Sequence, residues 1–523
     1  MIRLLCILLI LVLIQIKAHA QKPVFAKEWE KVLGSATWEY GNFNMLSKDS
    51  SGNFYVAGHS SGKYPSGTKT DHNCYSFDST TTPVDIWVTK VDANGNIMWD
   101  RTLGGVLDDG FSYSFSDNKN NVYIIGVSNS KPDCEKTEPR YSKKQDWWIV
   151  KLNESNVVQW DKRLGDIWDD KTYCGAMTPD NKLLIGGYSN GYIPGGDVTD
   201  TFVGFIDIWI VKMDTNGTKI WDNNYGSSSW DLVYNILPIS DSKYLITGST
   251  NGTYYGPSYG DVSDSSFSLV FDSTYWKYDN WLLLIDSAGN KIWDRRYGCL
   301  KADDYALCAA LSSNGNVAIG ATLGMASLQG NFYPCNDGIQ DTLPRGWIDS
   351  WVYVIDTANG DILKQRRFGG NVNEQVIQIL TTNDGGYLCV CHSNSDSSFE
   401  KSENRKVNLA DPNNYDFWLV RMDSNLNIIW DKTIGSGKRD ETPSVILLDD
   451  STFILAGVVT AGNSGDVGAP LYDSIISNAY DFWISKWHIV NPSNIEEINH
   501  YSFSLYPNPT TDIFVHHFTK HKK

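Results

Sequence analysis

Short runs of alternating apolar and polar residues fill most of the chain, and tight polar turns separate them. The stretch from Gly204 to Asp231, GFIDIWIVKMDTNGTKIWDNNYGSSSWD, is typical: two runs that each carry a tryptophan flank an Asn-Gly turn. Asn-Gly between two such runs is a strong signal for a β-hairpin, because both residues tolerate the positive φ that the turn requires. The pattern therefore predicts paired strands, and runs with the helical period are scarce.

The tryptophan-bearing pair of strands is repeated along the chain. An Asp-x-Trp triplet occurs seven times, beginning at Asp85, Asp146, Asp207, Asp279, Asp349, Asp416 and Asp481. Twelve residues after most of these Trp comes a second tryptophan, which Asp follows: Trp99, Trp160, Trp221, Trp293 and Trp430. The fifth repeat has Leu363-Lys364 there instead. The seventh repeat lacks this second strand, and a matching segment, EWEKVLGS around Trp29, stands near the N-terminus.

Each repeat also contains an acidic loop, a further strand, a second turn and an apolar strand, so one repeat supplies four short strands. Such units pack radially as blades of a β-propeller, because a single blade cannot bury both of its faces. We therefore predict an all-β fold, a seven-bladed β-propeller of four-stranded blades over residues 21–490. The displaced N-terminal strand is expected to complete the last blade and close the ring, which removes exposed sheet edges.

The stretch WVTKVDANGNIMWDRTLGG, which starts at Trp87, resembles the tryptophan-docking repeat of the quinoprotein-type propellers. That repeat carries an Asp, a Gly and then a Trp across the third and outermost strands of a blade. The resemblance implies that the Asp-x-Trp strand is third in its blade, that the Trp-Asp strand is outermost, and that the acidic loop leads to the innermost strand. We interpret the repeated tryptophans as packing residues, since a ligand would not need one in every blade.

A carboxylate stands five residues after the glycine that follows each outermost strand: Glu39, Asp109, Asp170, Asp231, Asp303, Glu374 and Asp440. One hypothesis is an acidic ring at one mouth of the channel, suited to Ca²⁺ or a basic ligand. The alternative, which we favour, is that each carboxylate accepts backbone N–H bonds within a recurring loop, because seven like charges near one axis would repel one another. Ca²⁺ is the one ion that this pattern suggests, and no other cofactor is predicted.

The loops that precede each Asp-x-Trp differ most between repeats, and in the predicted topology they share one face with the acidic loops. Variable loops on a rigid scaffold commonly carry recognition. The candidate ligand-binding residues are the loop aromatics Tyr64, Tyr192, Tyr254, Tyr255 and Tyr333. Together with the neighbouring Asn and Asp, these side chains suit a carbohydrate or a protein surface.

Motifs for catalysis do not stand out in the sequence. Gly-x-Ser-x-Gly occurs at residues 58–62 and 187–191, but both copies occupy the same place in the repeat, at the end of a strand. They lack the following helix that a nucleophile elbow requires. We therefore predict no catalytic residue, and a binding or scaffold protein for a glycan or a protein is the leading hypothesis. The alternative is a propeller enzyme, either a quinoprotein-like oxidoreductase or a hydrolase or lyase acting on polysaccharide.

The composition and the N-terminus concern location and partners. The 523-residue chain has a formal net charge of −17, which disfavours a nucleic-acid partner. Its first residues, MIRLLCILLILVLIQIKAHAQ, combine a basic start, an apolar run and a small-x-small site, so residues 1–20 are predicted to be a secretory signal peptide. Eight cysteines remain after cleavage. Disulfides are permitted in an exported chain, but the cysteine spacing does not recur between repeats.

The segment LYPNPTTDIFV near the C-terminus resembles the opening strand of the C-terminal sorting domain of type IX secretion cargo in Bacteroidetes. The residues that carry the motif are Tyr506, Pro507, Asn508, Pro509 and Asp512. The family domain continues through further strands, so residues 491–523 are expected to be a linker and a truncated sorting tail. The resemblance implies export by the type IX machinery to the cell surface or medium. The mature protein is expected to be a monomer without a transmembrane segment.

Overall fold

The computed structural model describes residues 23–42, 44–75, 83–191, 193–251, 260–263, 278–298, 303–324, 327–328, 331–332, 344–406, 414–472 and 480–490. The regular structure in these ranges consists of strands, and none of the residues described is helical. Accordingly, no helix there has the length and apolar character needed to cross a membrane. Contacts divide the chain into a compact unit, Lys27–Trp487, and a second unit of Met1–Ala26 with His488–Lys523. The signal peptide and the sorting motif lie outside the described residues.

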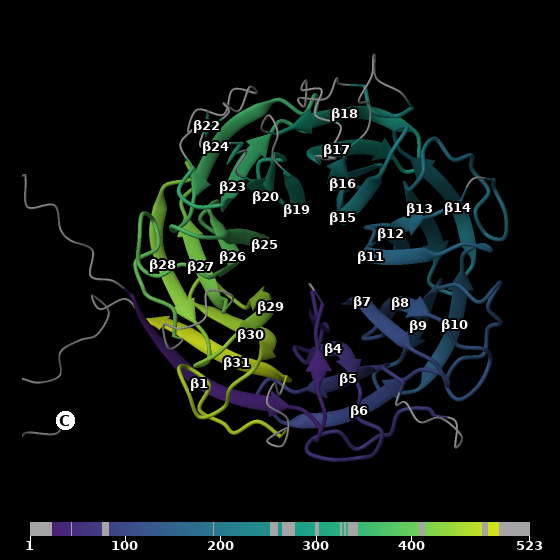
Figure 1. The fold of residues 1–523 in the computed structure, drawn as a ribbon, viewed down its shortest axis with the longest axis horizontal. Helices are drawn as coiled ribbons and strands as arrows, with labels where there is room; N and C mark the ends of the chain where they lie inside the picture. The colour runs from purple at the N-terminus through teal and green to yellow at the C-terminus, as the bar shows by residue number, and fades with distance from the viewer. Residues whose placement is uncertain are drawn as a thin grey trace, which may run out of the picture. The chain divides into compact units, whose positions relative to one another are not determined.

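The compact unit is a ring of seven antiparallel sheets, the blades of a β-propeller (Figure 1). This confirms the predicted fold class. From the axis outward, blade 1 contains β2 (Glu39–Tyr40) and β3 (Leu46–Lys48), then β4 (Phe54–Ser60), β5 (Asp85–Val91) and β6 (Ile97–Leu103). Blade 2 contains β7 (Asp109–Ser116), β8 (Val122–Ser128), β9 (Asp146–Leu152) and β10 (Val158–Leu164). Blade 3 contains β11 (Asp170–Met177), β12 (Lys182–Ser189), β13 (Asp207–Asp214) and β14 (Lys219–Tyr225).

The remaining blades follow the same order. Blade 4 contains β15 (Asp231–Ser240), β16 (Lys243–Thr250), β17 (Asp279–Asp286) and β18 (Lys291–Tyr297). Blade 5 contains β19 (Tyr305–Leu311), β20 (Val317–Gly324), β23 (Ile348–Ile355) and β24 (Ile362–Phe368), with the short pair β21 (Ser327–Leu328) and β22 (Asn331–Phe332) in a loop. Blade 6 contains β25 (Glu374–Thr381), β26 (Tyr387–Ser393), β27 (Asp416–Met422) and β28 (Ile428–Ile434). Blade 7 contains β29 (Asp440–Leu447), β30 (Thr452–Val459), β31 (Asp481–Val490) and β1 (Val24–Leu33).

The N-terminal strand closes the ring, as the displaced tryptophan segment predicted. Strand β1 is the outermost strand of blade 7 and pairs with β31, and Figure 1 shows the two side by side. The Trp483 indole Nε1 donates to Glu30 Oε2 at 2.9 Å, and Lys486 Nζ lies 2.9 Å from Glu28 Oε2. Segments from the two ends of the sequence therefore form one sheet, and closure leaves that blade without an unpaired outer edge at β31.

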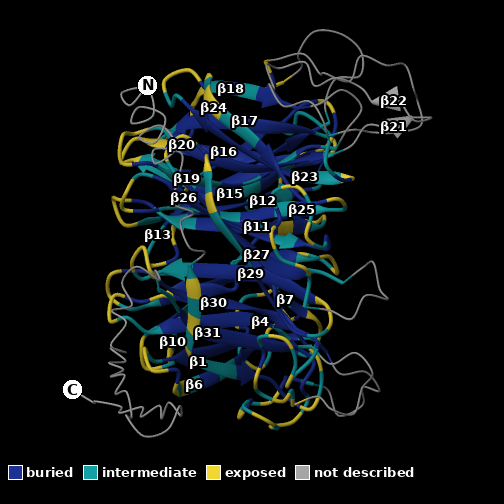
Figure 2. Cartoon of the chain, turned by 90° about the vertical axis from the view of Figure 1, so that its left-hand side faces the viewer, coloured by how far each residue is buried: buried dark blue, intermediate teal, exposed yellow. Residues whose placement is uncertain are grey.

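The first tryptophan of every repeat is buried in its blade. Figure 2 shows that the strands in general consist largely of buried residues. The indole N–H of this tryptophan donates to the aspartate of the outermost strand of the same blade. The pairs are Trp87–Asp100, Trp148–Asp161, Trp209–Asp222, Trp281–Asp294 and Trp418–Asp431, with donor–acceptor distances of 2.9–3.2 Å. Glu30 takes the place of this aspartate in blade 7. The repeated Trp-Asp thus combines apolar burial with a charge-assisted hydrogen bond.

Blade 5 shows what happens when this pair is missing. In blade 1, Asp100 of the outermost strand pairs with Thr89, which stands two residues after Trp87 in the neighbouring strand. In blade 5 the corresponding register pairs Tyr353 with Gln365, so Gln365 occupies the aspartate position. The buried Nε1 of Trp351 has no hydrogen-bond partner among the described residues.

A second recurring contact explains the glycine that follows each outermost strand. A Cβ placed on Gly34 would lie 2.0 Å from Oδ1 of Asp481, and one on Gly104 would lie 2.4 Å from Oδ1 of Asp85. These aspartates begin the Asp-x-Trp strands of blades 7 and 1. Only glycine leaves room for the carboxyl group at this distance.

Candidate functional site

The acidic loops place one carboxyl group at each junction between neighbouring blades. The backbone N–H of Asp109, at the start of β7, donates to the Val84 carbonyl of blade 1 at 2.7 Å, and Asp440 bonds to Tyr415 in the same way. Glu39, Asp109, Asp170, Asp231, Glu374 and Asp440 are all fully buried. The carboxyl groups are thus distributed around the ring inside the protein.

The side chain of each acid accepts hydrogen bonds within its own loop. Asp109 accepts from the Gly105 N–H at 2.6 Å and from the Ser130 hydroxyl at 2.9 Å. Asp440 accepts from the Ser436 N–H at 2.6 Å and from its hydroxyl at 2.7 Å. This is the arrangement expected for a carboxylate that orders a loop.

The fifth carboxylate differs from the residue that the spacing indicated. The loop after β18 is one residue longer than its counterparts, so Asp304 rather than Asp303 is fully buried at the start of the innermost strand. The Asp304 N–H donates to the Tyr278 carbonyl, as Asp109 does to Val84. Asp303 lies one position earlier and accepts from the Tyr278 N–H at 3.2 Å, as Asp108 does from Val84.

Each junction brings the loop acid close to the aspartate of an Asp-x-Trp strand. Burial, and then the charge of Asp109, raise the pKa of Asp85 to about 9. Burial raises the pKa of Asp109 itself to about 6. Burial and the neighbouring Asp416 hold the pKa of Asp440 well above its ordinary value. Two buried carboxyls at close range disfavour a double negative charge, which favours a proton on one member of each pair.

In two junctions an arginine balances the charge instead. Arg296 donates to Asp279 at 2.5 Å, and Arg367 donates to Asp349 at 2.5 Å. Both ion pairs are buried. Each arginine thus places a positive charge directly beside a buried carboxyl group.

A Ca²⁺ site built from the acidic ring finds no support in the described part of the chain. There, no three of these carboxyl groups bring oxygen atoms within 4.8 Å of one another. The group that meets this criterion is Cys74, Asp133 and Cys134, but Cys74 and Cys134 form a disulfide that joins the long loops of blades 1 and 2. Cys174, Cys308, Cys389 and Cys391 are buried free thiols.

The Gly-x-Ser-x-Gly copies end strands, as predicted. Ser60 is the last residue of β4 and Ser189 the last of β12. The Ser60 hydroxyl is buried and donates to Glu39 Oε1 at 2.9 Å. The serine therefore supports the acidic loop and is not presented to solvent as a nucleophile would be.

The long loops share a turn that the sequence analysis missed. A tight turn is closed by a two-residue bridge in five loops: Ser66–Lys69, Asp133–Lys136, Gly195–Val198, Ser398–Lys401 and Ser464–Val467. The backbone of this turn bonds to the glycine that follows the outermost strand, for example Thr68 N–H to the Gly34 carbonyl at 2.9 Å. The next threonine reaches the Trp-Asp carboxylate: Thr70 N–H donates to Asp100 at 2.9 Å. In the sequence, the segments that form this turn read GTKTD, CEKTE, GDVTD, FEKSE and GDVGA.

The loops present exposed aromatic rings on the face that carries the acidic loops. Of the candidate residues, Tyr64 is 62% exposed, whereas Tyr192, Tyr254, Tyr255 and Tyr333 lie outside the described residues. Further exposed aromatic residues, which the sequence analysis did not name, lie in the acidic loops and just before the Asp-x-Trp triplets. They are Trp38, Trp168, Phe205, Trp230 and Trp347, which are 36–64% exposed. The rings of Phe205 and Trp230 lie parallel within 2°, with centroids 6.5 Å apart.

The distribution of exposed apolar side chains is uneven. Among the residues described, the exposed aromatics all belong to loops or strand ends of this loop face. Exposed aliphatic side chains lie on outermost strands, as Met98, Ile220 and Ile429 do, and also in loops of this face, as Leu107, Ile167 and Ile193 do. Figure 2 shows the exposed residues concentrated in the turns and loops at the strand ends. Aromatic residues concentrated on loops of a rigid scaffold are typical of a binding face.

Comparisons with known proteins do not assign a family. No family model matches the chain, and no curated protein matches it. Solved structures do align with it: a protein of unknown function from Dyadobacter fermentans at 10% identity, covering 89% of this chain and 99% of that one, with a TM-score of 0.39. The Pan2 WD40 domain of Neurospora crassa aligns at 8% identity over 90% and 96% of the chains, with a TM-score of 0.40.

A third similar structure is the PQQ-bound aldose sugar dehydrogenase of Streptomyces coelicolor. It aligns at 10% identity over 90% of this chain and 98% of that one, with a TM-score of 0.32. At these identities and scores, none of the three similarities supports a function for this chain. The propeller itself rests on the sheet topology described above.

Proposed function

We propose that this protein is an exported binding protein that holds a neutral carbohydrate polymer against the loop face of its propeller. The observation that carries the proposal is the set of exposed rings at Trp38, Trp168, Phe205, Trp230 and Trp347. They project from loops on a scaffold of hydrogen-bonded sheets, so little ordering is needed when a ligand binds.

The chemistry of this face favours a carbohydrate. The C–H groups of a sugar ring pack against the face of an aromatic ring, whose π-electrons carry partial negative charge. The parallel rings of Phe205 and Trp230 offer aromatic faces for such a contact. The polar loop residues around them supply hydrogen-bond donors and acceptors for hydroxyl groups.

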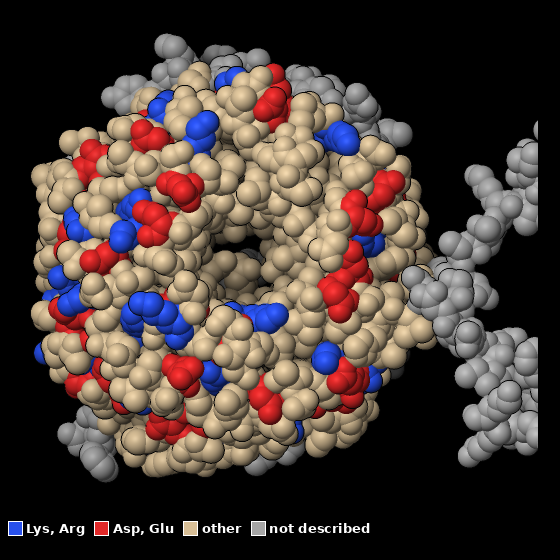
Figure 3. All heavy atoms as spheres, turned by 180° about the vertical axis from the view of Figure 1, so that it is seen from behind, with Lys and Arg blue, Asp and Glu red and all other residues tan. Residues whose placement is uncertain are grey.

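The electrostatics favour a neutral ligand. The carboxyl groups of the acidic loops are buried and accept hydrogen bonds inside the protein, so they are not displayed on the surface of this face. Figure 3 views the ring from the side opposite the long loops, and there acidic and basic side chains are interspersed around a central opening. The net charge of −17 opposes binding of an anionic polymer such as a nucleic acid.

A binding assay with matched variants tests the proposal. Residues 21–490 would be screened against an array of neutral and charged glycans and against neutral polysaccharides by affinity electrophoresis. We expect binding to neutral polymers, with a loss of about tenfold or more in Trp168→Ala/Trp230→Ala. The control is Met98→Ala, which truncates a residue 53% exposed on an outermost strand, and it should bind normally. Unchanged binding in the tryptophan variant, or binding to a protein partner alone, would refute the proposal.

We also propose that residues 1–20 and the Tyr-Pro-Asn-Pro tail direct export through the type IX route to the cell surface or medium. The support comes from the signal-peptide pattern and from the sorting-motif resemblance. Cell fractionation in a Bacteroidetes host would compare the full chain with one that lacks residues 491–523. Periplasmic retention of the shortened chain is expected. Equal surface display of both chains would contradict a sorting role for the tail.

A further inference from the structure

Five of the innermost strands carry an irregularity at the same place, whereas in blade 7 the shift in β29 falls between Glu441 and Ser444 and spans two residues. The register shifts between Phe111 and Tyr113, Thr172 and Cys174, Val233 and Asn235, Ala306 and Cys308, and Val376 and Gln378. Each shift leaves one extra residue unpaired, which is a β-bulge, and a bulge re-aims its side chain. The extra residues are Ser112, Tyr173, Tyr234, Leu307 and Ile377, each three positions after the buried carboxylate of its strand.

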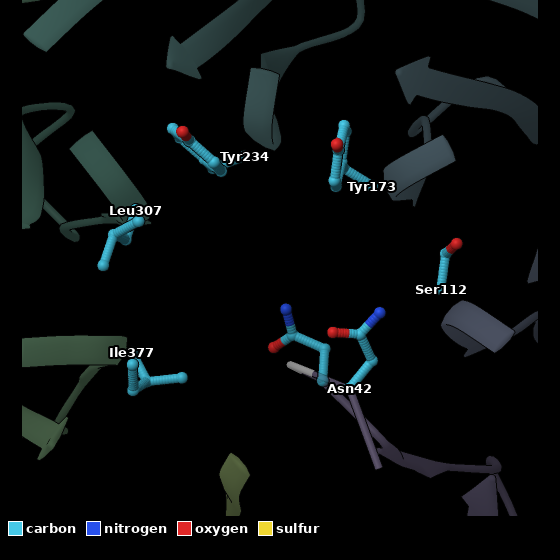
Figure 4. Close-up of a pocket in the computed structure, with 7 residues that line it drawn as sticks. Asn42, Ser112, Tyr173, Tyr234, Leu307 and Ile377 are labelled. Atoms are coloured by element: carbon cyan, nitrogen blue, oxygen red, sulfur yellow. The ribbon is translucent and has the colours of Figure 1, made fainter. Parts of the chain in front are cut away.

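These extra residues surround a cavity in the central channel. The cavity is lined by Asn42, Asn44, Ser112, Tyr173, Tyr234, Leu307 and Ile377. Figure 4 shows the labelled side chains around one common space. Because the carboxylates begin the innermost strands at the loop face, the cavity lies just inside the entrance on that face. The cavity has a volume of about 40 Å³ and opens to solvent in the channel.

Blade 1 contributes amides in place of a single bulged residue. Its innermost strand is split into β2 and β3, and Asn42 and Asn44 belong to the segment between them. Asn44 adopts a φ of 62°, a conformation that asparagine tolerates better than most residues. The Asn42 amide donates to the Phe111 carbonyl at 3.3 Å, which connects this segment to blade 2.

The two sides of the cavity differ in chemistry. Asn42, Asn44, Ser112, Tyr173 and Tyr234 form a polar and aromatic wall, and Leu307 and Ile377 form an aliphatic one. The Tyr173 hydroxyl and the Asn44 amide have no hydrogen-bond partner among the described residues. The Ser112 hydroxyl accepts from Thr172 at 2.8 Å, so its own proton remains available. No described lining residue is charged.

A continuous arc of tyrosines extends the aromatic wall across three blades. Tyr173 and Tyr188 have ring centroids 5.9 Å apart, Tyr173 and Tyr234 6.4 Å, and Tyr234 and Tyr305 6.0 Å at 89°. Tyr278 lies 5.7 Å from Tyr305. Burial raises the pKa of each of these hydroxyls above its ordinary value. The hydroxyls are therefore neutral donors and the rings are held rigidly against one another.

We propose that the ring of bulged residues is a binding site for one neutral sugar residue, with Tyr173 and Tyr234 packing on its C–H groups and Asn44 and Ser112 binding its hydroxyls. The site is distinct from the loop-face surface of the proposed function, and it stands whether or not that surface binds a polymer. A pyranose suits it because its apolar C–H groups and its rim of hydroxyls match a wall that combines aromatic faces with amides and hydroxyls. A charged ligand would find no opposite charge among the described lining residues.

Calorimetric titration with single sugars tests this site. The probes are glucose, galactose, mannose, xylose and N-acetylglucosamine, with glucuronate as the charged counterpart of glucose. We expect at least one neutral sugar to bind and its affinity to fall about tenfold or more in Tyr173→Ala/Tyr234→Ala. Asn44→Gly, which keeps the left-handed backbone accessible, and Tyr173→Phe, which keeps the ring, should each weaken binding without unfolding the protein.

The loop-face variant Trp168→Ala/Trp230→Ala separates this inference from the proposed function. It should keep single-sugar binding within about threefold, whatever it does to polymer binding. Four results would overturn the inference: no neutral sugar binds, glucuronate binds as tightly as glucose, Asn44→Gly and Tyr173→Phe leave the affinity unchanged, or the loop-face variant abolishes single-sugar binding.

Discussion

The bond between a buried indole and the aspartate of the outermost strand should couple measurably in stability. In blade 1, Trp87 Nε1 donates to Asp100 Oδ2 at 2.9 Å, and the Thr70 N–H donates to the same oxygen at 2.9 Å. The Thr70 hydroxyl donates to the other oxygen of Asp100. Trp87 is fully buried, and Asp100 is 9% exposed. The change Asp100→Ala therefore leaves one buried indole N–H and one part-buried backbone N–H without their acceptor.

The expected loss follows from the cost of unmade bonds. A buried donor left unsatisfied costs about 1–3 kcal/mol, so two of them predict a loss of roughly 2–6 kcal/mol in the free energy of unfolding. The Thr70 hydroxyl can rotate to another acceptor and adds little. Asp100→Asn keeps an oxygen acceptor without the charge, so its loss should be smaller. Trp87→Phe removes the indole donor along with part of the packing.

A double-mutant cycle separates the bond from the packing. Urea unfolding, followed by circular dichroism and by the fluorescence of the remaining tryptophans, would be measured for Asp100→Ala, Trp87→Phe and the combined variant. We expect the two changes to couple by about 1.5–3 kcal/mol, the range for hydrogen bonds to charged groups. A coupling energy near zero, with coincident transitions from both probes, would refute the claim that this bond stabilises the blade.

The other predictions concern blade 5 and the pH dependence. Gln365→Asp would supply the acceptor that Trp351 Nε1 lacks, so urea unfolding should show a gain of about 1 kcal/mol; a loss would count against the assignment of this position. The raised pKa of Asp85, about 9 because of burial and of Asp109, means that its contribution is fully present below pH ~4 and is lost as the pH rises toward 9. Asp85→Asn keeps this side chain neutral, so the melting temperatures of wild type and variant should differ least near pH ~4, and wild type should lose stability relative to the variant as the pH rises toward 9; a constant difference from pH 5 to 9 would exclude a protonated Asp85. Burial lowers the pKa of His59, whose Nε2 accepts from the Phe111 N–H at 3.0 Å. Its contribution should be present above pH ~6.5 and lost below it, and a His59→Gln variant whose melting temperature falls in parallel with wild type on acidification would contradict this.

The fold could be predicted because its determinants are local and repeated. Alternating apolar positions, Asn-Gly turns and the paired tryptophans specify each blade. The segment around Trp29 could be matched to the missing strand of the last repeat because it carries the same pattern. Ring closure followed from that match alone.

The channel site could not be predicted because it depends on strand register. The residues that line it were unremarkable in the sequence: Tyr173 and Ile377 stand three positions after Asp170 and Glu374, but the bulges in β11 and β25 that set them apart from the paired residues became known only from the structure. A bulge is set by pairing with the neighbouring strand, which a linear pattern does not encode. The same reason explains Asp303, where counting residues across a longer loop selected the neighbour of Asp304.

The loop turns were missed for a different reason. Loops of different length hid the common segment that contains Lys69, Lys136 and Lys401 in three blades and valine in others. Equivalent positions such as Thr70 and Thr137 bond to the aspartate of the outermost strand. Because lysine stands at this position in some blades and valine in others, the sequence showed no common residue there, although the backbone forms the same turn.

The central claim is that the two ends of the sequence form one blade, and zero-length cross-linking tests it most directly. Lys486 Nζ and Glu28 Oε2 are 2.9 Å apart and partly accessible to solvent. Carbodiimide treatment of residues 21–490, followed by proteolysis and mass spectrometry of the monomer band, should yield an amide between Glu28 and Lys486. This product should disappear in Lys486→Gln. Absence of the link in the wild-type monomer, or its appearance only in cross-linked dimers, would contradict closure of the ring by the N-terminal strand.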